Sequence, residues 1–157
     1  MTNLRRAGEI QQRARVILAT ERERLAPLLP PHELRLTGGT SVATALTKGD
    51  VDLHLRVDDV SFRATVAALR RLYVVVHRHI WTDTLATFSV PASLPTGVAV
   101  TPIGSEHDVR FLTTWQLLSS RPDLLAEYNA VKQAAGADYE ARKSAFFDQL
   151  VRDAGHP

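Results

Sequence analysis

Residues 50–57 of the chain, DVDLHLRV, alternate polar and apolar side chains at every position. A β-strand turns successive side chains to opposite faces, so this alternation predicts a strand with valines and leucines on one face. The other face then carries Asp50, Asp52, His54 and Arg56. A strand with one dry and one polar face needs a sheet and a covered core. It also places two carboxylates next to each other on the polar face.

The rest of the chain adds helices and further strands around this one. Helical spacing of apolar residues predicts helices over residues 3–28 and 60–72, a short one over 41–46, and a helical region after residue 108 that is broken at 119–123 and at Gly136. Runs rich in β-branched residues predict strands over residues 33–37, 73–80, 85–90 and 98–103. This order predicts an α/β (α+β) fold in which a mixed sheet is flanked by helices.

Length and composition indicate one globular domain. A chain of 157 residues with 45% hydrophobic and 23% charged residues is long enough for one hydrophobic core. We divide it into an N-terminal helix (1–30), an α/β core (31–105) and C-terminal helices (106–157). The chain has no cysteine, so a bound metal would need oxygen or imidazole ligands.

Charge and hydropathy exclude several classes of partner. The pI is about 9.3, but the net charge is only +2 and acidic residues are interleaved with the arginines, which argues against a nucleic-acid partner. No apolar run approaches the roughly 20 residues of a membrane span, so no membrane partner is expected. The first two dozen residues contain arginine and glutamate where a signal peptide would be apolar. We therefore expect a cytoplasmic protein.

A glycine turn precedes the two aspartates. Gly38 and Gly39 allow a tight turn, and the N–H groups of residues 39–41 that follow can face an anion. On one strand face, Asp50 and Asp52 have Cα atoms roughly 6.6–7 Å apart, so both carboxylates can reach one hard cation. Together these features describe a site for a magnesium-bound polyphosphate. The structural alternative, an ordinary glycine turn before an edge strand, stays open at this stage.

The combination resembles the polymerase-beta-like nucleotidyltransferase superfamily, and within it the GrpB-like family. The superfamily has a glycine turn followed by two acids one residue apart on the next strand. The GrpB-like run GSTSVPGLAAKPIIDI aligns without a gap on residues 38–53, GGTSVATALTKGDVDL. The family lysine falls on Lys48 and the family aspartate on Asp52, while Asp50 restores the paired acids of the superfamily.

The resemblance continues in the C-terminal third of the chain. The family pattern L-x-x-x-P-E falls on residues 118–123, and its two Y-x-x-x-K motifs fall on Tyr128 with Lys132 and on Tyr139 with Lys143. Each pair is an i,i+4 neighbour on one helix face. The resemblance implies that these helices form a cap that directs Lys132 or Lys143 toward the cleft. The alternative is that the tyrosines pack in the core while the lysines extend to water.

The resemblance implies a predicted nucleotidyltransferase that transfers a nucleoside monophosphate from a nucleoside triphosphate to an unknown small-molecule or protein acceptor. Mg²⁺ would be held by Asp50 and Asp52, and His54 would accept a proton or donate a hydrogen bond to a carboxylate. The nucleotide and its phosphates would contact Gly38, Gly39, Thr40, Ser41, Lys48, Lys132 and Lys143, with Tyr128, Tyr139 and Arg110 as further ligand contacts.

The sequence departs from the family pattern at several positions. The superfamily has a third carboxylate on a later strand and GrpB-like sequences have a histidine there, but this chain has Ala99. Asp83, Glu106 or Asp108 could supply the missing ligand from a neighbouring loop. The family F-R-D is replaced by residues 114–116, TWQ. The alternative function is therefore a non-catalytic or repurposed protein of this fold that binds a nucleotide or another small metabolite.

Two further histidines lie in the predicted strand over residues 73–80. His77 and His79 alternate across Arg78, so in a strand they would share one face and could bind a metal. No acidic residue lies beside them in the sequence, so a metal site there has little support.

Overall fold

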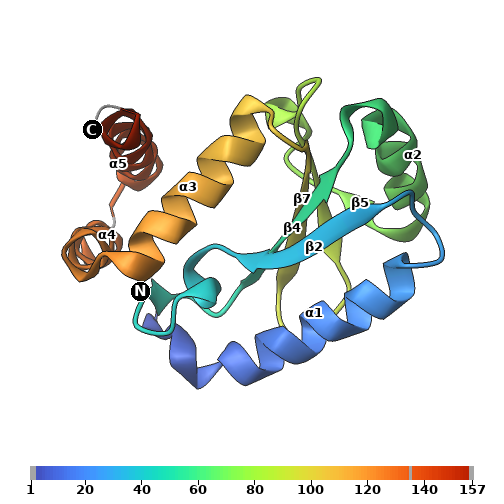
Figure 1. The fold of residues 1–157 in the computed structure, drawn as a ribbon. Coiled ribbons are helices and arrows are strands. Elements are labelled where there is room, and N and C mark those ends of the chain that lie inside the picture. Colours follow the sequence, from blue (N-terminus) through green and yellow to red (C-terminus); the bar gives the residue numbers. More distant parts are fainter. Residues whose placement is uncertain (1–2, 135, 156–157) are drawn as a thin grey trace.

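The computed structural model describes residues 3–134 and 136–155. Its centre is a mixed five-stranded sheet with the strand order β2–β4–β7–β6–β5 (Figure 1). The strands are β2 (His32–Thr37), β4 (Val51–Val57), β5 (Val74–Val75), β6 (Ala86–Val90) and β7 (Thr96–Pro102). β4 is antiparallel to β2 and parallel to β7. The predicted mixed sheet flanked by helices is therefore confirmed.

The described residues form five α-helices, which are α1 (Gln11–Leu25), α2 (Phe62–Leu72), α3 (Glu106–Ser120), α4 (Pro122–Gln133) and α5 (Tyr139–Ala154). Of these, α1 and α2 pack on one face of the sheet, α3 lies over the other face, and α4 and α5 pack on α3 (Figure 1). The short strands β1 (Arg5–Arg6) and β3 (Leu46–Thr47) pair as a separate two-stranded sheet. Among the described residues, no helix is both long and apolar enough to cross a bilayer.

The dry face of the sheet forms the main hydrophobic core with α1 and α2. The apolar residues of β4 predicted by the alternation, Leu53 and Leu55 among them, are buried there with Ile17 of α1 and Leu69 of α2. A second core lies in the C-terminal helices, where Leu118, Leu125, Tyr128 and Leu150 pack with partly buried aromatic residues. The two cores place α3, α4 and α5 on the side of the sheet away from α1 (Figure 1).

The sequence misplaced some boundaries. The strand predicted over residues 73–80 ends at Val75, because His77 adopts left-handed φ and ψ angles of 51° and 41° and a 3-10 helix follows over Arg78–Ile80. The helix predicted over residues 41–46 is wrong: a 3-10 turn at Gly39–Ser41 is followed by turns, and Leu46 begins β3. The N-terminal helix begins only at Gln11, after β1 and a 3-10 turn at Ala7–Glu9.

A buried polar network holds α3 against the polar face of the sheet. The Asp108 carboxylate, which is fully buried, accepts hydrogen bonds from Arg56 Nε at 2.7 Å and Nη2 at 3.0 Å. It also accepts from Thr101 Oγ1 at 3.1 Å and from the Gly104 N–H at 2.9 Å. Burial alone would raise the pKa of Asp108, but these bonds, led by those from Arg56, lower it. The aspartate is therefore ionised and paired.

Removing this carboxylate should destabilise the protein strongly. In Asp108→Ala, Arg56 keeps its pair with the exposed Glu33 but loses its buried partner, and the Gly104 N–H loses its acceptor, so the free energy of unfolding should fall by about 3–5 kcal/mol in urea denaturation. The control is Asp123→Ala, which removes an exposed pair with Arg121 and should change the stability by about 1 kcal/mol or less. Equal losses in the two variants would contradict a structural role for the network.

Candidate active site

The glycine turn packs directly against an aspartate of β4. Gly38 has φ 69° and ψ −170°, and a Cβ at this position would lie only 2.3 Å from Asp52 Oδ2. Glycine is therefore required both for the backbone conformation and for the space. Two hydroxyls stabilise the turn by hydrogen bonds to backbone carbonyls. Ser41 Oγ donates to the Gly38 carbonyl, and Thr40 Oγ1 donates to the Asp50 carbonyl, both at 2.6 Å.

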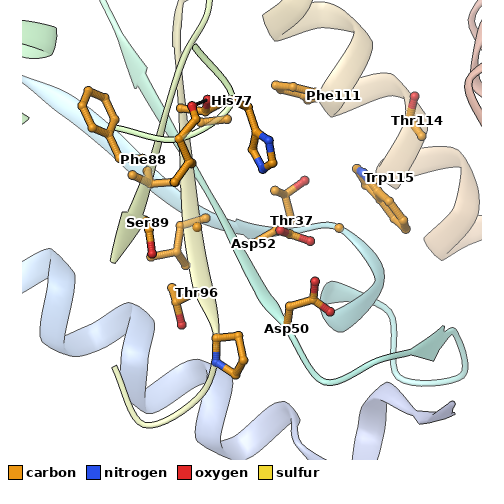
Figure 2. Close-up of a pocket in the computed structure, with 18 of the residues that line it drawn as sticks. Thr37, Asp50, Asp52, His77, Phe88, Ser89, Thr96, Phe111, Thr114 and Trp115 are labelled. Carbon is orange, nitrogen blue, oxygen red and sulfur yellow. Dashed lines mark hydrogen bonds between the residues drawn. The ribbon is translucent and has the colours of Figure 1, made fainter. Parts of the chain in front are cut away.

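The structure brings the two predicted carboxylates together. Asp50 precedes β4 and Asp52 lies within it, and both side chains point into the same space (Figure 2). The Asp52 carboxylate is reached by solvent from one open side, while protein surrounds it elsewhere. This surrounding protein, followed by repulsion from Asp50, raises the pKa of Asp52 to about 6. Ionising Asp52 at neutral pH therefore has a cost in the folded protein.

Three lysines surround this carboxylate pair. Lys143, Lys132 and Lys48 each oppose the rise in the pKa of Asp52, with Lys143 acting most strongly. Lys143 lines the same cavity as the aspartates, whereas Lys48 is exposed on the loop beside Asp50. The chain contains no other lysine. All three lysines of this arginine-rich sequence thus lie near one pair of acids.

Aromatic rings position the lysines of the cap. The Lys132 ammonium lies 5.7 Å from the ring centroids of both Tyr128 and Tyr139, and Lys143 lies 5.8 Å from Tyr139 and 6.0 Å from Phe147. Tyr139 therefore contacts both ammonium groups, and each contact is favourable. Burial lowers the pKa of Lys132. The ammonium groups are held beside the acids, while Tyr128, 2% exposed, packs in the core as the alternative interpretation proposed.

The aspartates lie in a cavity of about 480 Å³ between the sheet and the cap. This volume is within the ordinary range of small-molecule sites, about 300–1,000 Å³. Gly97 and Ala99 of β7 lie beside Asp52 and His54 in the sheet, and their small side chains leave the space open. The opposite wall is α3 and α5, with Phe111, Trp115 and Phe147 (Figure 2). The walls are mostly apolar, and the charged groups cluster around the aspartates.

Several predicted site residues do not line this cavity: Gly39, Thr40, Ser41, Lys48, His54, Tyr128, Lys132 and Tyr139. His54 is buried, its Nε2 is 2.8 Å from Thr101 Oγ1 and 3.4 Å from Asp108 Oδ1, and the edge of Phe111 packs against it. Burial lowers the pKa of His54 to about 4, so the imidazole is neutral at pH 7. The geometry therefore favours the structural interpretation of His54, a hydrogen bond within a buried carboxylate network, over proton transfer at the cavity.

The suggested third carboxylate is also not at the site. Asp108 is engaged by Arg56, Asp83 lines a separate surface groove with Asp59 and Arg63, and Glu106 does not line the cavity. Within residues 3–134 and 136–155, no three His, Cys, Asp or Glu side chains gather closely enough to hold a metal. Arg110 does line the cavity, but its guanidinium is paired with Asp148. Asp50 and Asp52 are thus the carboxylates the cavity offers.

Some cavity residues were missed from the sequence alone. Thr37, Thr87, Ser89 and Phe111 line the cavity, and their roles depend on which strands become neighbours. The polar alternation of Thr87 and Ser89 in the sequence could have shown that they share one face of a strand. The alternation could not show the strand order, in which β7 lies between β4 and β6 and places Asp52, Gly97 and Ser89 in one row across the sheet.

Comparison with known proteins identifies the family. The model of the GrpB protein family matches residues 9–153. The chain belongs to the GrpB family. The conserved protein GrpB from Enterococcus faecalis has a similar structure, with a TM-score of 0.68 at 14% identity over 91% of this chain and 95% of that one. A search of the curated proteins found no match.

The GrpB fold is shared with larger proteins. The Cid1 poly(U) polymerase in its MgGTP-bound structure matches 78% of this chain with a TM-score of 0.55 at 19% identity. The GLD-2/RNP-8 complex matches 88% with a TM-score of 0.59 at 15% identity. This chain spans 40% and 56% of those two chains. The likeness confirms a nucleotidyltransferase-type fold for this GrpB family member.

The contact between Gly38 and Asp52 can be tested by substitution. Gly38→Ala places a methyl group against the carboxylate at positive φ, so it should lower the free energy of unfolding by about 2–5 kcal/mol. Gly104→Ala is the matched control, because φ is +83° there but no atom lies within 4 Å of the added Cβ. The control should lose only about 1–2 kcal/mol. Equal losses of unfolding free energy in the two variants would show that Gly38 is not in close contact with Asp52.

The raised pKa of Asp52 makes a prediction about stability and pH. The folded pKa of about 6 is above the ordinary value of 3.8, so ionising Asp52 favours unfolding, and this cost is present at pH 7 and absent below about pH 4. Asp52→Asn should therefore melt at a higher temperature than wild type at pH 7. The difference should shrink as the pH falls through 6 toward 4. A variant less stable than wild type at pH 7 would contradict the charge repulsion.

Proposed function

We propose that this GrpB family protein is a Mg²⁺-dependent nucleotidyltransferase. It would transfer a nucleoside monophosphate from a nucleoside triphosphate to a small-molecule or protein acceptor. The observation that carries the proposal is that a glycine turn, two carboxylates and Lys143 meet in a single cavity, with Lys132 and Lys48 close enough to lower the pKa of Asp52. Such a site is suited to an anion and a divalent cation at once.

The donor set fits one magnesium ion. Mg²⁺ is commonly held by one or two carboxylates, with phosphate oxygens and water as its other ligands. Asp50 and Asp52 would supply the carboxylates, and their mutual repulsion, seen in the raised pKa of Asp52, is the cost that a cation removes. When bound, the ion would neutralise charge on the phosphates. The described residues offer no third carboxylate for a second ion.

The protein's own groups would bind and orient the triphosphate. Lys143 and Lys132 provide point charges for phosphate oxygens, and the rings of Tyr139 and Phe147 restrict their motion. The backbone of the turn at Gly38 and Gly39 can approach a phosphate closely because it carries no side chains. Transfer of this type depends mainly on positioning and on charge neutralisation. That the Cid1 structures include MgGTP-bound and Mg 3'-dATP-bound forms supports a magnesium nucleotide as the donor.

A second candidate is a nucleotide or metabolite binder without transfer activity. Two observations favour it: no third carboxylate accompanies Asp50 and Asp52 in the described part of the chain, and the cavity walls beyond the aspartates are mostly apolar. In that case the lysines and the turn would still hold a phosphate. The two candidates differ in turnover, not in the place of binding.

Ligand-induced thermal stabilisation tests the proposal. A ligand that binds only the folded state raises the melting temperature, by about 2.7 kcal/mol of stability at a hundredfold excess over its Kd. We expect one of ATP, GTP, CTP or UTP to raise the melting temperature with Mg²⁺, and the Mg²⁺-dependent part of the rise to disappear in Asp52→Asn. Asp58→Asn is the control, because Asp58 is an exposed acid after the same strand and outside the cavity.

Release of pyrophosphate then separates the two candidates. A transferase should release pyrophosphate from the nucleotide that stabilises it, and Asp52→Asn should abolish the release. A binder should show the stabilisation and no release. The absence of any Mg²⁺-dependent stabilisation with all four nucleotides would reject the transferase.

A further inference from the structure

One histidine of the cavity has an unusual backbone. His77 has φ 51° and is the one non-glycine residue with positive φ within residues 3–134 and 136–155. Left-handed backbone is uncommon for a side chain other than glycine, asparagine or aspartate, and such strain gathers at functional sites. The residue lines the cavity, in the loop that leaves β5. The turn at His77 ends the strand and directs the imidazole into the space between the sheet and α3 (Figure 2).

His77 and two of the lysines lie on different sides of the carboxylates. In Figure 2, Asp52 lies between His77 and Asp50. Lys48 lies two residues before Asp50, and Asp50 affects the pKa of Lys132 more strongly than Asp52 does. Lys48 and Lys132 are therefore placed toward the Asp50 side of the carboxylates, and the imidazole of His77 lies on the other side.

This arrangement limits where an acceptor can bind. In transfer from a nucleoside triphosphate, the attacking and leaving oxygens are roughly in line through the phosphorus. If the leaving pyrophosphate is held by the lysines and the α-phosphate lies at the aspartates, the acceptor must approach from the far side of the carboxylates. That side is the compartment bounded by His77 and Phe111.

His77 is suited to take a proton in this compartment. The ionisable side chains that line the cavity are Asp50, Asp52, His77, Arg110 and Lys143. Arg110 is paired with Asp148, Lys143 is assigned to the phosphates and both aspartates to the metal, which leaves the imidazole. Resting on the proposed function, we propose that His77 is the catalytic base that accepts the proton of an acceptor hydroxyl or amine as it attacks the α-phosphate.

The step balances in atoms and charge. The acceptor oxygen or nitrogen forms a bond to the α-phosphorus, the bond from that phosphorus to the bridging oxygen breaks, and pyrophosphate leaves. The acceptor's proton moves to the imidazole and then to water. Val76 and Phe111 beside His77 are apolar. The acceptor class is thus a small molecule with an apolar or aromatic body that carries one hydroxyl or amine.

The left-handed backbone makes His77→Gly an informative variant. Glycine adopts φ 51° without strain, so the variant should melt at the same temperature or up to about 4 °C higher than wild type. The Mg²⁺-dependent stabilisation by the nucleotide should remain, because the lysines and aspartates are intact. Pyrophosphate release should fall about 10²–10⁴-fold, the usual contribution of a general base. His79→Gln is the control, since its ring centroid is 6.1 Å from that of His77 but it does not line the cavity.

Chemical rescue and a pH profile supply readouts that a structural role would not change. Imidazole added to His77→Gly should restore pyrophosphate release in proportion to its concentration. The wild-type rate should rise with pH as one group loses its proton, and this dependence should disappear in the variant. The ionisable groups that line the cavity with His77 are Arg110 on α3, Lys143 on α5, and Asp50 and Asp52 on the β4 side, and His79 lies beside it in its own loop; all of them remain in the variant.

The outcomes separate this proposal from the proposed function. Pyrophosphate would be measured with water as the acceptor and with phenol, benzyl alcohol, benzylamine and ethanolamine as probes. Wild-type activity that survives His77→Gly, or that imidazole does not restore, overturns the role of His77 but leaves the transferase. Nucleotide binding without pyrophosphate release from wild type overturns both the base and the transfer, and leaves the binder. No nucleotide binding at all overturns the proposed function itself.

Discussion

The cavity exists because the Asp108 carboxylate holds α3 above the polar face of the sheet. The sheet side of this contact is Arg56 on β4 and Thr101 on β7, and the helix side is the first turn of α3. Beyond this anchor the helix crosses the sheet without filling the space over Gly97 and Ala99. Asp108, which the sequence suggested as a metal ligand, instead holds α3 in place and so determines the geometry of the site. Its pairing also explains why His54 is part of the frame and not of the cavity.

The sequence predicted most of the local structure because period and turn chemistry are local. The alternation of residues 50–57 gave β4, its buried face and the convergence of Asp50 and Asp52. The glycines gave the turn, although its hydroxyls brace the backbone and its helical part is a single 3-10 turn. The end of β5 was missed because nothing in the β-branched run indicates that His77 adopts left-handed angles.

Features that depend on strand order could not be predicted from local patterns. Ser89 and Thr87 reach the site because β7 lies between β4 and β6 and contributes glycine and alanine in the same rows. Local patterns also could not show which acid of α3 pairs with Arg56, since Glu106 and Asp108 are close in sequence and only Asp108 is buried. The lysines were found through the family resemblance. The rings that hold them beside the aspartates became visible only in three dimensions.

Asp52 and Lys132 are ionisable groups at positions where a charge lowers the stability of the folded protein. Burial and repulsion from Asp50 raise the pKa of Asp52, and burial lowers the pKa of Lys132. Each charge is costly by itself, and the magnesium triphosphate that we propose would offset both costs, because the cation would neutralise the acids and the phosphates would neutralise the lysines. A purely structural cluster would pair the lysines with the aspartates directly. Among the described residues no such ion pair forms, which agrees with the proposed binding of a ligand at this place.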